Sequence, residues 1–146
     1  MPDDYLDGLQ AEDRVEMWRG RISRSDLPPL LVAVVTDEVV GFAVFGAEQS
    51  PTSPPSCGEL YAMNLDPDHW GQGIGRVLLR RVTDTLIAMG DKEAVLWVVP
   101  ENLRARALYE SEGWVADGGV STEEILGVTV TDIRYRKPLV ASLARA

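Results

Sequence analysis

Short apolar runs bounded by turn residues predict the strands of this chain. Two valine-rich runs flank Asp37 and Glu38, which is the pattern of a hairpin. A continuous apolar run that ends at Pro100 is typical of a strand buried on both faces. The last run alternates apolar and polar positions, as a half-buried strand does. The predicted strands are residues 30–36, 39–45, 59–65, 94–99, 114–116 and 129–137.

A period of 3.6 residues predicts helices at residues 15–22, 74–89 and 102–112, with one or two helical turns before the first. Gly90 is well placed to end the middle helix, and Asn102 to open the last one. We find no internal repeat, so residues 1–146 are expected to form a single domain of the α/β (α+β) class. The middle helix carries one apolar stripe, made of Ile74, Leu78, Val82, Leu86 and Met89.

Composition excludes several classes of function. The formal net charge of −9 argues against a nucleic-acid-binding surface and mildly favours cationic small molecules or basic peptides as partners. Cys57 is the only cysteine and His69 the only histidine, so no internal disulfide is possible and no metal site is expected. Residues 1–10 have neither a basic segment nor an apolar core, so no signal peptide is expected, and no apolar run approaches membrane-spanning length. We therefore expect a cytoplasmic protein that does not contact a membrane.

Three glycines alternate with other residues in the stretch DPDHWGQGIGRVLLR, residues 66–80, between a predicted strand and a predicted helix. A Walker loop is excluded because Arg76 and Val77 follow the last glycine, and the dinucleotide fingerprint fails on its third glycine. A glycine turn at a helix start still presents backbone amides that can hold a pyrophosphate. A turn that only lets the helix pack on the strand fits the glycines equally well.

Two motifs in this order resemble the GNAT superfamily of N-acetyltransferases. Residues 70–75, WGQGIG, resemble its motif A, and residues 102–114, NLRARALYESEGW, resemble its motif B. The resemblance covers roughly residues 30–139. It implies the GNAT fold, with a central mixed, mostly antiparallel sheet flanked by helices, and acetyl-CoA as cosubstrate without a metal. The implied pyrophosphate contacts are the backbone amides of Gln72, Gly73, Ile74, Gly75 and Arg76.

The resemblance also assigns roles outside the glycine turn. Glu59 matches the general base of histone acetyltransferases in the superfamily, although many relatives use water chains and the side chain could equally be a solvated glutamate. The backbone of Met63 would donate to the thioester oxygen, and that of Leu65 would pair with the pantetheine amide. Asn102 would lie near the CoA arm, besides capping its helix. Tyr109 would protonate the departing thiolate, or would only pack on its helix.

One motif position departs from the family pattern. Trp70 stands where the family usually has Gln or Arg. Because most phosphate contacts in the family come from the backbone, we expect weaker rather than abolished binding. A positive charge near the phosphates could come from Arg76, Arg80 or Arg104 instead, although each arginine is also compatible with a solvated helix face.

The function that the resemblance implies is acetyl transfer from acetyl-CoA directly to a primary amine of a small molecule, peptide or protein. The alternative is a GNAT module that binds acetyl-CoA as a sensor or partner domain without efficient transfer. Acidic side chains before the last strand, Asp117, Glu123 and Glu124, weakly suggest a cationic acceptor.

The N-terminus generates an expectation about assembly. Relatives begin with a strand and a helix before the segment that residues 2–9 resemble, and Met1 lies almost on that segment. We therefore expect the first strand and most of the first helix to be missing, which would leave residues 30–36 with an open edge. Covering that edge would require a homodimer, or else the side chains of Tyr5, Leu6 and Leu9.

Overall fold

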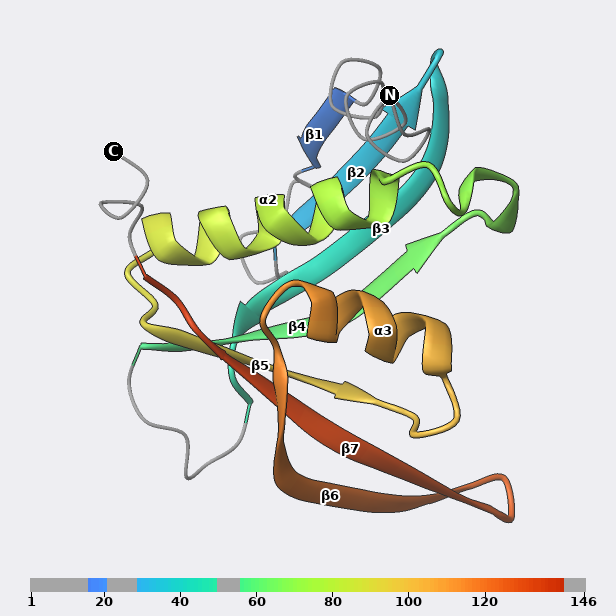
Figure 1. The fold of residues 1–146 in the computed structure, drawn as a ribbon, viewed down its shortest axis with the longest axis vertical. Coiled ribbons are helices and arrows are strands. Elements are labelled where there is room, and N and C mark those ends of the chain that lie inside the picture. Colours follow the sequence, from blue (N-terminus) through green and yellow to red (C-terminus); the bar gives the residue numbers. More distant parts are fainter. Residues whose placement is uncertain (1–15, 21–28, 50–55, 141–146) are drawn as a thin grey trace. The chain divides into compact units, whose positions relative to one another are not determined.

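The structure, a computed structural model, describes residues 16–20, 29–49 and 56–140. The chain forms two compact units, one of Met1–Gly46 with Leu60–Thr85 and one of Ala47–Glu59 with Leu86–Ala146. Figure 1 shows the elements along the chain. They are β1 (Glu16–Gly20), β2 (Leu30–Val35), β3 (Glu38–Ala47), β4 (Cys57–Leu65), a 3₁₀ turn (Pro67–His69), α2 (Ile74–Ala88), β5 (Glu93–Val98), α3 (Leu103–Ser111), β6 (Val115–Ile125) and β7 (Val128–Pro138).

The first unit contains strands in the order β1-β2-β3-β4. Thr36 and Asp37 form the turn of the β2–β3 hairpin, and both have positive φ angles, 50° and 64°. This conformation matches the right-handed twist of the two strands. The predicted hairpin is confirmed, with its turn one residue earlier than Asp37 and Glu38.

Apolar side chains from β2, β3 and α2 form the core of the first unit. Ala33, Val35, Val40 and Ile74 are buried together there. Along α2 the predicted stripe is inaccessible to solvent except at its last position, Met89, which is 54% exposed. Gly90 has a φ angle of 96°, and its amide donates to the Ile87 carbonyl. Gly90 therefore ends the helix as predicted.

The second unit contains the antiparallel order β5-β7-β6. The β5 strand buries Ala94, Val95, Leu96 and Val98, as expected for the continuous apolar run. Strands β6 and β7 form the long hairpin seen in Figure 1. The expectation of a short strand at 114–116 was wrong, because the pairing continues to Ile125 and the chain reverses at Leu126 and Gly127, both with positive φ.

The expectation for the N-terminal region was wrong in two respects. Residues 16–20 form a strand, not part of a helix, because their backbone pairs with β2 from Glu16 opposite Val34 to Gly20 opposite Leu30. Tertiary pairing outweighs a helical period in so short a segment. The same pairing closes the edge of β2 that was expected to be open. An open edge therefore no longer supports a homodimer, and the homodimer stays a prediction. Tyr5, Leu6 and Leu9 lie outside the described residues.

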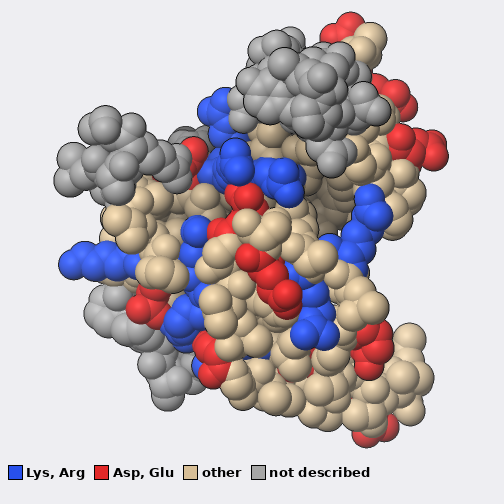
Figure 2. Space-filling model, in the orientation of Figure 1, with Lys and Arg blue, Asp and Glu red and all other residues tan. Residues whose placement is uncertain are grey.

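The surface of the described residues mixes both charges. On the face that Figure 2 shows, basic side chains lie among acidic ones. Neither α2 nor α3, the two α-helices of the described part, has the length and hydropathy needed to cross a bilayer.

Candidate functional site

The glycine turn leads directly into α2. Gly71 and Gly73 have φ angles of 76° and 81°, a region that residues with a Cβ atom rarely adopt. The carbonyl of Gly73 accepts the first helical bond, from the Val77 amide at 3.1 Å. Helix geometry leaves the amides of Ile74 and Gly75 without acceptors inside the helix, and Gly75 adds no side chain. A pyrophosphate fits such a site.

A tight connection joins the end of β4 to this turn. The Asp66 amide donates to the Val40 carbonyl at 2.7 Å, and the Asp66 carboxylate accepts from the Asp68 amide at 3.0 Å. The Trp70 amide then donates to the Pro67 carbonyl at 3.1 Å. These bonds within the first unit fix the path from Leu65 to Gly71.

The Trp70 side chain also takes part in this connection. Its Nε1 donates to the Leu65 carbonyl at 3.0 Å, while the Leu65 amide donates to Asn64 Oδ1 at 3.0 Å. Both main-chain groups of Leu65 are therefore engaged by exposed side chains. A ligand that pairs with Leu65 like an added strand has to displace Asn64 or Trp70. Sequence reasoning treated Trp70 only as a missing Gln or Arg.

Glu59 lies in the part of β4 that belongs to the second unit and is half-buried. Its Oε1 accepts from the Gln49 amide at 3.2 Å. Burial raises the pKa of Glu59 above its ordinary value, and the charge of Glu48 acts in the same direction while the Gln49 amide opposes it. The carboxylate therefore takes up a proton more readily than an exposed glutamate.

Cys57 precedes Glu59 by two residues and is buried. Its thiol donates to Glu48 Oε2 at 2.9 Å, and Arg136 Nη1 is 4.0 Å from the sulfur. Burial, followed by the hydrogen bond and the charge of Glu48, raises the pKa of Cys57 to about 11. The sulfur is a protonated thiol at neutral pH and not a nucleophile.

Asn102 and Tyr109 begin and anchor α3 in the second unit. Asn102 is the N-cap, because its Oδ1 accepts from the Ala105 amide at 3.2 Å. Tyr109 is 7% exposed, with its ring centroid 6.4 Å from that of Trp114 and 6.3 Å from that of Tyr135. Burial raises the pKa of Tyr109, so its phenol holds its proton more firmly than an exposed tyrosine does.

The negative charge expected at Asp117 is compensated. Its carboxylate accepts from Arg134 Nε at 2.7 Å and from Arg136 Nε at 3.0 Å. Asp117 therefore links β6 to β7 and gives no support for a cationic acceptor. Glu123 and Glu124 lie further along β6 and are exposed.

The structure thus distributes the predicted site residues over two units. Met63, Leu65 and the turn from Gln72 to Arg76 belong to the first unit. Glu59, Asn102 and Tyr109 belong to the second.

Comparison with known proteins identifies the family to which this chain belongs. Residues 2–114 match the model of the acetyltransferase (GNAT) family. The chain belongs to the GNAT family. The predicted fold class is confirmed, since this GNAT chain has the mixed sheet with flanking helices found in solved GNAT structures.

Three relatives illustrate the similarity. The mycothiol acetyltransferase of Beutenbergia cavernae is 36% identical over 105 residues, which cover 72% of this chain and 35% of that protein. The uncharacterized N-acetyltransferase YuaI of Bacillus subtilis is 33% identical over 105 residues, covering 70% and 57%. A GNAT family acetyltransferase from Elizabethkingia anophelis, solved with acetyl-CoA bound, superposes with a TM-score of 0.68 at 16% identity, covering 87% and 99%. This GNAT chain thus spans about a third of the mycothiol acetyltransferase.

We predict that Cys57 resists thiol reagents in the folded protein. With a pKa of about 11, only about one thiol in a thousand is ionised at pH 8, and burial restricts access further. Labelling with a chromogenic disulfide should be at least about 100-fold slower than in the denatured chain. Equal labelling rates in the two states would contradict the environment described for Cys57.

Proposed function

We propose that this protein is an N-acetyltransferase that moves the acetyl group of acetyl-CoA directly to a primary amine. The observation that carries the proposal is the glycine turn, with positive φ at Gly71 and Gly73, at the start of α2 in a chain of the GNAT family. Free backbone amides at a helix start, beside glycines that add no side chain, are a feature that binds a pyrophosphate. The acetyl-CoA bound to the Elizabethkingia anophelis relative supports the choice of ligand.

The proposal assigns the phosphates to backbone amides of residues 72–76 in the first unit. The helix dipole and the amides of the first turn favour a negative charge there without a lysine. The amide of Met63 is proposed to donate to the thioester oxygen, where charge develops during attack. Leu65 is proposed to pair with the pantetheine arm after Asn64 or Trp70 has released it.

Proton transfer is assigned to the second unit. An amine with a pKa near 10.4 costs about 4.6 kcal/mol to deprotonate at pH 7. Glu59, whose pKa is raised by burial, is proposed to take this proton directly or through water. The amine nitrogen then bonds to the carbonyl carbon while the carbon–sulfur bond breaks.

The leaving thiolate also needs a proton. Tyr109, whose phenol is protonated at neutral pH, is proposed to supply it and to be reprotonated by the second proton that the attacking nitrogen loses as it becomes an amide. Asn102 is proposed to lie near the CoA arm while it caps α3. The acceptor is proposed to be the primary amine of a small molecule, peptide or protein, in agreement with the N-acetyltransferase name of YuaI.

The first test measures acetyl-CoA binding by calorimetry. Gly73→Val should weaken binding at least about tenfold, because the new side chain blocks the approach to the amides. Gly127→Val is the matched control, since Gly127 has nearly the same φ, 80°, and lies in the β6–β7 turn. The backbone strain is thus similar in both variants. Failure of the unmodified protein to bind acetyl-CoA would refute the proposed function.

The second test is Glu59→Gln. Turnover near pH 7 should fall about tenfold or more while acetyl-CoA affinity stays unchanged, because the base acts on the amine. The deficit should shrink as pH rises and the amine deprotonates unaided. Glu38→Gln, at an exposed position that begins β3, is the control. Unchanged turnover at neutral pH would remove Glu59 from the mechanism.

Thermal melts separate this effect from unfolding. The folded-state pKa of Glu59 is raised, so its contribution to stability is present at low pH and is lost as pH rises through that pKa. The glutamine that replaces Glu59 in the variant cannot ionise. The melting temperature of the variant at pH 7 should therefore equal or exceed that of the unmodified protein.

The third test is Tyr109→Phe, followed by thiol release with an accepted amine. Turnover should fall by about one to two orders of magnitude if the phenol is the general acid. Acetyl-CoA affinity serves as the internal control and should change little. A fully active Phe variant would mean that the ring serves only for packing.

A further inference from the structure

The helix that carries Tyr109 has few apolar contacts to fix its orientation. Tyr109 is the buried residue of α3, while Leu103 on its first turn is 69% exposed. Ala105 and Leu108 are only half-buried, so apolar packing holds this nine-residue helix at few points. Polar contacts therefore contribute to how Tyr109 is presented.

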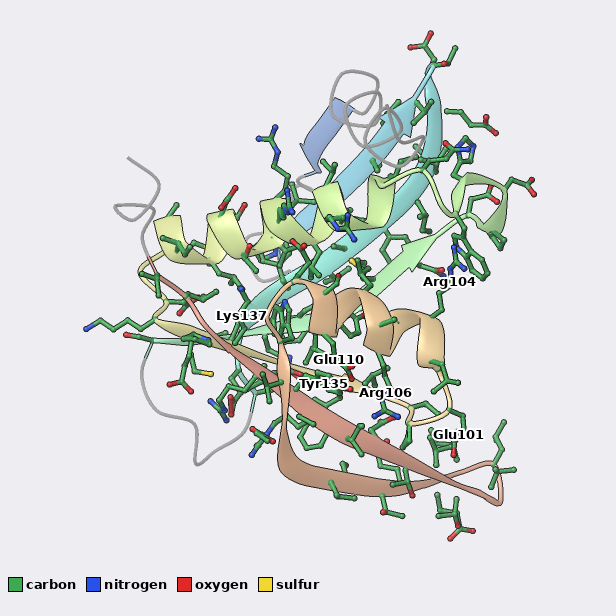
Figure 3. All side chains as sticks on the ribbon, in the orientation of Figure 1. Glu101, Arg104, Arg106, Glu110, Tyr135 and Lys137 are labelled. Carbon is green, nitrogen blue, oxygen red and sulfur yellow. The ribbon has the colours of Figure 1, made fainter. Side chains whose placement is uncertain are left out.

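Three polar side chains supply those contacts. Tyr135 on β7 is inaccessible to solvent, and its hydroxyl accepts from Arg106 Nε at 2.9 Å and donates to Glu110 Oε2 at 2.5 Å. Arg106 also donates through Nη1 to the Pro100 carbonyl at 2.8 Å. In Figure 3 the labelled side chains of Arg106, Glu110 and Tyr135 converge between α3 and β7. Because Arg106 and Glu110 are four residues apart on one face of the helix, a single hydroxyl fixes its rotation.

The same tyrosine supports Tyr109 through its ring. The two ring centroids are 6.3 Å apart with the planes tilted by 58°, which is a favourable aromatic geometry. Trp114 contacts Tyr109 at 6.4 Å and completes the aromatic cluster. The hydroxyl of Tyr135 thus fixes α3 through hydrogen bonds, and the ring of Tyr135 packs against Tyr109, which α3 carries.

We propose that Tyr135 is a positioning residue for Tyr109, acting through its hydrogen bonds to Arg106 and Glu110. The inference rests on the proposed function in so far as Tyr109 is the proton donor of that reaction. Tyr135 itself is buried beneath α3 and is assigned no contact with a substrate. Its part is to keep the Tyr109 phenol in one orientation.

Tyr135→Phe tests the proposal because it removes the hydroxyl and keeps the ring. The turnover number should fall about tenfold with little change in KM for acetyl-CoA. In a Tyr109→Phe background the same substitution should change turnover less than about twofold, because the group that it positions is gone. An equal loss in both backgrounds, or no loss in either, would overturn the proposal.

Two further sets of variants distinguish positioning from a general loosening of α3. Lys137 on β7 also holds the end of this helix, since its Nζ donates at 2.7 Å to the carbonyl of Glu112, the C-cap residue. Lys137→Met should lower the melting temperature and leave turnover within about twofold. Glu110→Gln keeps an oxygen that can accept from Tyr135 and should retain most activity, whereas Glu110→Leu should behave like Tyr135→Phe. A loss in Lys137→Met as large as in Tyr135→Phe would overturn the proposal.

A titration of phenolate absorbance gives an answer that does not depend on turnover. The titration curve of Tyr109 alone is obtained by subtracting the curve of a variant that carries Tyr109→Phe from the curve of the same protein with Tyr109 in place. Tyr135→Phe should lower the pKa of Tyr109 toward its ordinary value, because the ring becomes more accessible. An unchanged Tyr109 transition would overturn the positioning role. Absence of acetyl-CoA binding with a shifted transition would refute the proposed function and leave the contact between the two tyrosines established.

Discussion

The left-handed conformation of Gly71 and Gly73 is the constraint on which the first unit depends. It lets the chain leave β4, make the turn at Asp66 and enter α2, where helix geometry leaves the amides of Ile74 and Gly75 without acceptors inside the helix. The apolar stripe of α2, from Ile74 to Leu86, then lies buried along one face of the helix. The burial of the Ile74 side chain and the place of these amides at the helix start are two consequences of the same turn. A residue with a Cβ atom at either glycine would strain both.

Trp70 shows how a change of side chain can preserve this turn. Its indole nitrogen binds the carbonyl of Leu65 and so ties the end of β4 to the beginning of the glycine turn. Glutamine or arginine at this position would be free to reach a phosphate, whereas the tryptophan is held by the main chain. The departure from the family motif therefore exchanges a polar side chain for a local structural bond. In the site proposed above, phosphate binding would therefore depend on the backbone to a greater extent.

The sequence predicted those parts of the fold that local patterns determine. The hairpin at Asp37, the helix that begins at Ile74 and the cap at Asn102 each depend on side chains within a few residues of one another. Strand β1 could not be predicted, because Glu16–Gly20 becomes a strand only through pairing with residues at least ten positions away. The same limit applies to Tyr135. The alternation of its segment predicted strand β7, but the partners of Tyr135 on α3 are set by tertiary contact. Among candidate residues, the motifs located the turn and Tyr109, while the engagement of Leu65 and the neutralisation of Asp117 required the structure.

The chemistry open to the second unit follows from two neighbouring residues of β4 that both lie near Glu48. At Glu59 and at Cys57, burial and the charge of Glu48 raise the pKa. For a carboxyl group the shift brings the pKa closer to neutrality and makes the group a better proton acceptor. For a thiol the shift to about 11 moves ionisation out of reach at neutral pH. The same surroundings thus favour Glu59 as a base and disfavour Cys57 as a nucleophile, which supports direct transfer to the amine over an acetyl-cysteine intermediate.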